Sequence, residues 1–118
     1  MYSVNTTLVF QKTARKLAKK YRNLQQDLLP VLDCLEHGTF AGDPVPGFEG
    51  SIYKVRIRSS DQQKGKRGGF RMIYLIDQVN RKIWLLTLYA KAKQENIRVN
   101  EIQQLLDDLF SSPDTSEE

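Results

Sequence analysis

The sequence predicts an α+β domain in which an N-terminal helical hairpin and a C-terminal helix pack around a twisted antiparallel β-sheet. Apolar residues recur at helical spacing before residue 38 and again after residue 98. Three short apolar runs between residues 52 and 89 instead have the length and composition of strands. The 118 residues suit one domain, expected over residues 1–110, followed by a disordered acidic tail at residues 111–118.

The N-terminal stretch is expected to form an edge strand and a first helix. Residues 2–6 are short, alternating and rich in β-branched side chains. Apolar residues then follow at helical spacing from Phe10 to Tyr21, with Thr6 or Thr7 as the N-cap. Lysines and arginines occupy the other sides of this segment. The pattern predicts an amphipathic helix with a basic outer surface.

A second helix is predicted to follow and to pack antiparallel on the first. Asn23 and Gln26 have the spacing of a capping box, and leucines continue the helical pattern until Gly38 offers a C-terminal stop. Pro30 lies inside this pattern and lacks a backbone N–H. We therefore expect either a kink or a late helix start there.

The predicted sheet follows a loop rich in glycine and proline at residues 38–50. In residues 52–58 apolar and basic residues alternate, so one face of this strand should carry Lys54, Arg56 and Arg58. Residues 70–77 and 82–89 are apolar on both parities, which is typical of central strands covered by helices. The expected result is a three-stranded antiparallel meander with a long first hairpin.

The last predicted helix covers residues 99–110. Its apolar stripe consists of Ile102 and three leucines, and Asn100 with Gln103 offers a second possible capping box.

Positive charge is concentrated in residues 52–93. This window holds 11 lysines and arginines against two acids, a charge of about +9, whereas the whole chain is +4. A fold does not need that excess, so we expect a polyanionic partner, either nucleic acid or a membrane surface.

The remaining composition favours a cytoplasmic protein. Cys34 is the single cysteine, so an intramolecular disulfide is impossible and no zinc-ligand spacing exists. No apolar run is long enough to span a membrane, and the N-terminus lacks the regions of a signal peptide.

The basic hairpin at residues 59–69 does not have the pattern of a phosphate-binding loop. Lys66 is followed by Arg67 rather than by serine or threonine, and the segment joins two strands instead of a strand and a helix. Two interpretations remain open. The hairpin, with Lys64 beside these residues, either contacts a nucleic-acid backbone or is merely solvated.

Arg71 is the most informative single residue, because it stands inside an apolar strand where an unpaired charge is costly. Either a carboxylate, such as one from the acidic last helix, or a bound phosphate would explain it. Tyr89, Lys91 and Lys93 share a strand parity, so one edge would present a phenol with two ammonium groups. Tyr53 and Tyr74 are expected in the core.

The chain offers no paired carboxylates, no Ser/His/Asp set and no metal cluster. His37, the only histidine, lies at a predicted helix end, where a solvated role is expected. RNA cleavage is compatible with this inventory. The 2′-hydroxyl is an internal nucleophile, so the protein needs only to position the phosphate, stabilise charge and assist proton transfer.

Three motifs give the sequence a family resemblance. YKVR at residues 53–56, KGKRGGFR at residues 64–71 and LYAK at residues 88–91 resemble the RelE/HigB superfamily of bacterial type II toxins, and the HigB-like branch most closely. The sequence departs from RelE proteins with a catalytic tyrosine near the C-terminus, because residues 97–110 contain none.

The resemblance implies a toxin that cleaves mRNA on the ribosome and is silenced by a cognate antitoxin. It implies no metal and no small-molecule cofactor. The residues implied in catalysis are Lys54, Arg56, Arg71, Tyr89 and Lys91, and those implied in RNA binding are Arg58, Lys64, Lys66, Arg67 and Lys93. The same fold also hosts ParE-like gyrase inhibitors, so a non-catalytic binding module, including an inactive RNA-binding relative, is the alternative.

Overall fold

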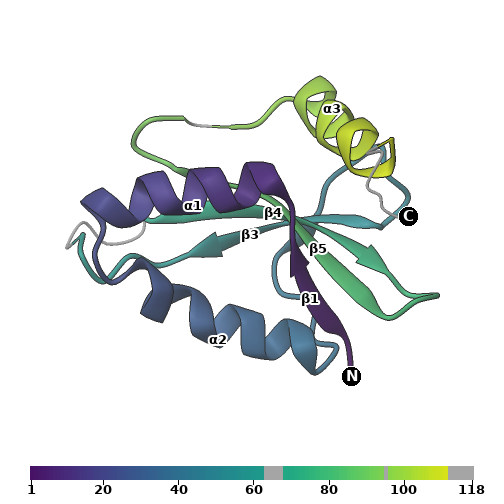
Figure 1. The fold of residues 1–118 in the computed structure, drawn as a ribbon, viewed down its shortest axis with the longest axis horizontal. Helices are drawn as coiled ribbons and strands as arrows, with labels where there is room; N and C mark the ends of the chain where they lie inside the picture. The colour runs from purple at the N-terminus through teal and green to yellow at the C-terminus, as the bar shows by residue number, and fades with distance from the viewer. Residues whose placement is uncertain (63–67, 95, 112–118) are drawn as a thin grey trace.

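The computed structural model describes residues 1–62, 68–94 and 96–111, and it contains both helices and strands, as the sequence predicts (Figure 1). Lys64, Lys66 and Arg67 lie outside the described residues, as do residues 112–118 of the acidic tail. In chain order the elements are β1 (Ser3–Thr6), α1 (Leu8–Lys20), α2 (Leu24–Glu36), β2 (Asp43–Pro44), β3 (Ile52–Ile57), β4 (Phe70–Asp77), β5 (Lys82–Ala90) and α3 (Val99–Phe110).

The two N-terminal helices run in opposite directions along the sheet (Figure 1). Thr7 is the N-cap of α1, and its hydroxyl accepts a hydrogen bond from the Phe10 amide at 3.1 Å. The capping box predicted for α2 is wrong, because the Asn23 side chain makes no cap. Pro30 lies well inside α2, so the alternative of a late helix start is wrong as well. Gly38 ends this region with a positive φ of 83°, as predicted.

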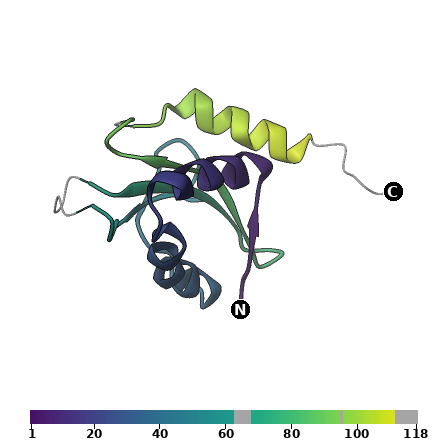
Figure 2. The same ribbon diagram turned by 60° about the vertical axis from the view of Figure 1, so that its left-hand side comes forward.

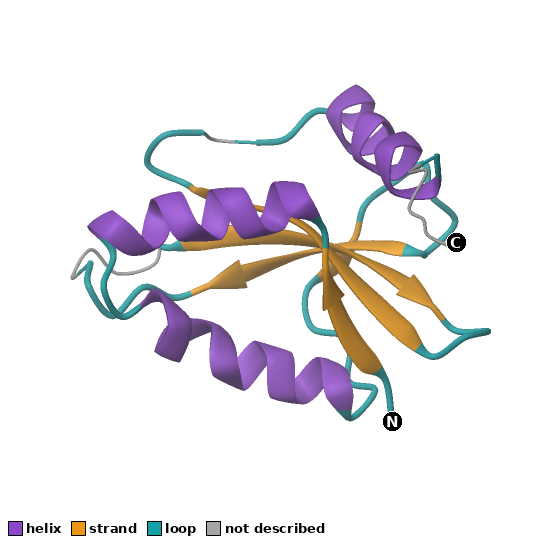
Figure 3. Ribbon diagram, in the orientation of Figure 1, coloured by secondary structure: helices purple, strands orange, loops and turns teal. Residues whose placement is uncertain are grey.

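The five strands form one mixed sheet in the order β1-β5-β4-β3-β2 (Figure 3). The antiparallel meander β3-β4-β5 is confirmed. β1 is an edge strand, as predicted, but it runs parallel to β5, and the two-residue β2 adds to β3 inside the predicted loop. The α+β fold class is therefore confirmed with one parallel pair that the sequence pattern did not reveal.

Helices cover both faces of the sheet, and Figure 2 shows α2 and α3 on opposite sides of it. The first core joins α1 and α2 to one face through residues such as Phe10, Leu28 and Met72. The second core joins α3 to the other face through Ile102, Ile73 and neighbouring residues. This double coverage explains why β4 and β5 are apolar on both parities.

The last helix has the predicted bounds but a different cap. Arg98 is the N-cap, and its backbone N–H donates to the Glu101 carboxylate at 3.0 Å, so the predicted pair of Asn100 and Gln103 is wrong. Among the described residues, none of the helices is long and apolar enough to cross a membrane.

Candidate functional site

Three strands bring four of the five predicted catalytic residues to one face of the sheet. In the strand register Arg56 lies opposite Arg71, and Arg71 lies opposite Tyr89. Lys54 is two residues from Arg56 on the same strand and therefore points to the same side. We call Lys54, Arg56 and Arg71 the basic row. Neighbouring strands are about 4.8 Å apart, so these side chains occupy one continuous surface.

Arg71 is a buried cation that lacks an acidic partner within the described residues. Its side chain is 9% exposed, and Nη1 donates to the Phe70 carbonyl at 3.2 Å and approaches the Gly68 carbonyl at 3.5 Å. No described carboxylate lies within 4.0 Å of it. Burial, and then the charge of Arg56, lower the pKa of Arg71, while Tyr89 acts in the opposite direction. Of the two roles predicted for Arg71, the carboxylate pair is not observed in this part of the chain.

Tyr89 lies beside Arg71 and is also buried. Its hydroxyl has no hydrogen-bond partner in the described part of the chain, and its ring belongs to the second core with Ile102. Burial raises the pKa of Tyr89, and Arg71 offsets part of this rise. The side chain is therefore a neutral phenol near neutral pH, able to donate a proton to an atom that approaches it. Tyr74 is a core residue, as predicted, and Tyr53 is half-buried against the same core.

The other members of the basic row are more accessible. Lys54 is half-buried, and its Nζ donates to the Asn96 side chain at 3.2 Å, which ties β3 to the loop before α3. Arg56 is exposed near the end of β3. Arg58 is exposed too, but it follows the end of β3 at Ile57. The alternation predicted from the sequence is thus confirmed for the two residues inside the strand.

The predicted alignment of Tyr89, Lys91 and Lys93 along one strand does not extend to Lys93, because β5 ends at Ala90 and the chain then turns. The Lys91 N–H donates to the Gly69 carbonyl at 3.0 Å, two register positions beyond the pair of Arg71 and Tyr89. The Lys93 N–H donates back to Ala90 at 3.1 Å. Strand parity does not apply across such a turn, and Lys93 instead lines a different surface.

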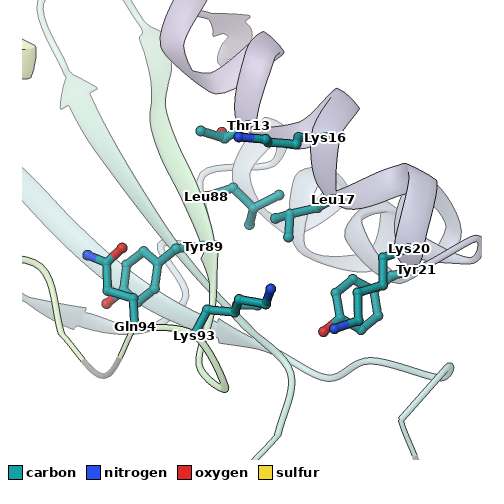
Figure 4. A pocket seen from close by; sticks show the side chains of 10 residues that line it. Thr13, Lys16, Leu17, Lys20, Tyr21, Leu88, Tyr89, Lys93 and Gln94 are labelled. Carbon is teal, nitrogen blue, oxygen red and sulfur yellow. The ribbon is translucent and has the colours of Figure 1, made fainter.

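That surface is a cleft between α1 and the end of β5 (Figure 4). Sequence reasoning placed the basic side of α1 in solvent and did not connect it with Lys93. The volume of the cleft is about 420 Å³, and the residues that line it are Thr13, Lys16, Leu17, Lys20, Tyr21, Leu88, Tyr89, Ala90, Lys93 and Gln94. The spacing of Lys16 and Lys20 by one helical turn was the only signal in the sequence.

The base of the basic hairpin is fixed on α2. The Asp61 carboxylate accepts hydrogen bonds from the backbone and side chain of Asn23 at 2.8 and 3.2 Å. Gln62 accepts a hydrogen bond from the Gly69 amide at 2.7 Å and donates to the Tyr21 hydroxyl at 3.3 Å. These contacts hold the segment that leads into Arg71.

Among the described residues, those with metal-binding or nucleophilic chemistry do not gather at this face. His37 is exposed at the end of α2, with Nδ1 2.8 Å from the Asp33 carbonyl, and Cys34 is exposed. Over residues 1–62, 68–94 and 96–111, no group of His, Cys, Asp and Glu side chains is arranged to hold a metal ion.

Comparison with solved structures supports the fold. The free-state mutant of E. coli toxin RelE matches with a TM-score of 0.56 and 19% identity, over 80% of this chain and 87% of that chain. The intact E. coli RelBE toxin-antitoxin complex matches with a TM-score of 0.54 and 20% identity, over 75% and 94%. A conserved hypothetical protein from Helicobacter pylori matches with a TM-score of 0.56 and 17% identity, over 79% and 98%.

The sequence itself matches a family model. The model describes the RelE toxin of the RelE/RelB toxin-antitoxin system, and it aligns with residues 6–109. The HigB-like branch stays a prediction. Because the match spans most of the chain, the protein belongs to the RelE family of toxins from toxin-antitoxin systems.

Proposed function

We propose that this toxin is an endoribonuclease that cleaves mRNA on the ribosome and is neutralised by a cognate antitoxin. The observation that carries the proposal is the basic row beside Tyr89, with a buried Arg71 that has no described carboxylate partner. A buried cation without an acid is costly to the fold. A phosphate of the substrate would supply the missing negative charge.

The chemistry uses the nucleophile that RNA itself provides. The 2′-oxygen attacks the adjacent phosphorus, the O2′–P bond forms and the P–O5′ bond breaks, which leaves a 2′,3′-cyclic phosphate and a free 5′-hydroxyl. Negative charge grows on the non-bridging oxygens, where Arg71 and Arg56 would stabilise it. No residue of the protein needs to form a covalent bond.

Two proton transfers complete the reaction, and the raised pKa of Tyr89 favours one role for it. A neutral phenol is a better donor than acceptor, so Tyr89 would protonate the departing 5′-oxygen. Lys54 or Lys91 would then assist removal of the proton from the 2′-hydroxyl. Lys54 is held near the site by its hydrogen bond to Asn96, and Lys91 is two register positions beyond the pair of Arg71 and Tyr89.

The ribosome and the antitoxin enter through the family. The family model describes the toxin of a toxin-antitoxin system, and one of the two solved E. coli structures is a toxin-antitoxin complex. The resemblance of the sequence motifs to this superfamily supports a ribosome-dependent nuclease. The basic surface would face the phosphates of mRNA and of the ribosome. Lys64, Lys66, Arg67 and Arg58 would add electrostatic attraction without selecting a base.

The test is inducible expression in bacteria, with primer extension on a reporter mRNA. We expect growth arrest and cuts that depend on translation, both relieved by Arg71→Ala and by co-expression of the antitoxin. Arg15→Ala, which removes an exposed cation of α1, is the control and should remain toxic. An equally toxic Arg71→Ala protein would contradict the proposal. Intact mRNA together with DNA damage would instead identify a gyrase inhibitor.

A further inference from the structure

The cleft between α1 and the end of β5 has the chemistry of an anion site that the cleavage reaction does not use. Three ammonium groups, those of Lys16, Lys20 and Lys93, line it, and none of its lining residues is acidic (Figure 4). Its walls also include Leu17 and Leu88, so an apolar surface lies beside the cations. Within the described residues these lysines make no salt bridge.

The cleft meets the candidate active site at the outer edge of β5, where Leu88 belongs to the first core on one face and Tyr89 to the second core on the other. Arg56 and Arg71 of the basic row and the neighbouring Tyr89 lie opposite one another on β3, β4 and β5, in a line nearly perpendicular to the strands. β1 pairs only with residues 82–85 of β5, so the rest of β5 has no described strand neighbour on its outer side. The cleft lies at this open edge, and Tyr89 contributes to both surfaces.

We propose that the cleft binds one nucleotide of single-stranded RNA, adjacent to the nucleotide whose phosphate lies at the basic row. Its phosphate would contact Lys16, Lys20 and Lys93, and its base would pack against Leu17. This inference rests on the proposed function, because it takes the row as the place of the reacting phosphate. The contacts are to backbone and to an aliphatic wall, so they would bind RNA with little base selectivity.

The dimensions favour a nucleotide over a protein segment. A volume of about 420 Å³ lies within the range of sites that hold small ligands, of about 300–1,000 Å³. An acidic peptide would also be attracted to the three lysines. It would not, however, be directed to the row across β5, whereas a polynucleotide carries a phosphate at each repeat and would contact both surfaces in succession.

The test compares two double variants of the same helix. Lys16→Gln/Lys20→Gln removes two charges from the cleft, and Lys12→Gln/Lys19→Gln removes two exposed charges of α1 that do not line it. Glutamine and lysine have similar helix propensities, so both variants should fold, which circular dichroism would check. Binding of a 2′-O-methyl RNA oligonucleotide, which cannot be cleaved by 2′-hydroxyl attack, is measured by fluorescence anisotropy at several salt concentrations.

We expect the salt dependence to separate the variants. Each phosphate contact contributes about 0.7 to the slope of log K against log salt for a single strand, so the cleft variant should lose about 0.7 and the control almost nothing. Equal slopes for the two variants, or no RNA binding by the wild type, would refute the inference. Normal RNA binding with lost neutralisation by the antitoxin would assign the cleft to a protein partner and refute it too.

These outcomes separate the inference from the proposed function. If the wild type cleaves mRNA and the two double variants have equal slopes, only the cleft assignment fails. If the slopes differ but no mRNA is cleaved, the nuclease proposal fails and the cleft still binds RNA.

Discussion

Replacing Arg71 by methionine tests separately how this residue affects the stability of the fold and how it contributes to activity. Methionine is unbranched and similar in length but uncharged. The change removes the repulsion between Arg71 and Arg56 across the strands, which destabilises the fold by about 0.2–1 kcal/mol. It also removes the cost of burying a charge on a side chain that is only 9% exposed. It also removes hydrogen bonds to two carbonyls, at a cost of about 1 kcal/mol. We expect the free energy of unfolding to fall by no more than about 1 kcal/mol, or to rise.

The same variant should lose most of its activity. A preorganised donor to a developing oxyanion contributes about 10²–10³-fold to the rate, so cleavage should fall by about that factor. Unfolding in urea can be followed through Trp84, the only tryptophan, and cleavage by primer extension. Arg15→Met is the control for loss of one positive charge. A loss of stability of about 3 kcal/mol or more would show that Arg71 is half of a structural ion pair, and our reasoning would be wrong.

Three further predictions concern the fold that supports the site. Tyr74→Phe removes a buried hydrogen bond to a main-chain carbonyl and should destabilise by about 1 kcal/mol in urea, whereas Tyr53→Phe, on the ring stacked against it, should cost less. Gly69→Ala should cost more than Gly47→Ala in thermal unfolding; both have positive φ, but only at position 69 would the new Cβ overlap the backbone of β3. Hydrogen bonds from Asn80 lower the pKa of the Asp77 carboxyl in the folded protein. The stabilising contribution of Asp77 is therefore complete above its unfolded-state pKa and is lost as the pH falls through the lower folded-state pKa. Asp77→Asn should flatten this dependence of stability on acid pH.

The sequence predicted the sheet correctly where the two-residue repeat of a strand was enough to assign each side chain to a face. The alternation of Tyr53, Lys54, Val55 and Arg56 is a local pattern, and it assigned the cations to one face correctly. The bounds of α3 followed from a stripe of leucines in the same way. Such patterns are set by neighbouring residues, so they need no knowledge of the tertiary structure.

The predictions that failed depended on contacts between distant segments. Asn23 has the sequence of a cap, but Asp61 binds its amides instead. Lys93 has the parity of Tyr89, but the chain turns after Ala90, so parity ceases to apply. The cleft needs α1 and the end of β5 together, and no pattern within either segment contains that information.

The position of the site follows from the limited length of α3. Twelve helical residues span about 18 Å, whereas the eight residues of β4 span about 26 Å, so a helix along the strands could not cover the whole second face. On β4 the change occurs within one repeat, because Ile73 belongs to the second core and Arg71, two residues earlier on the same face, belongs to the row. The packing of α3 is therefore close to Arg71. A substitution that leaves a cavity at Ile73 should displace Arg71 more than a substitution in the first core that lowers the free energy of unfolding equally, because the first core lies on the opposite face of the sheet.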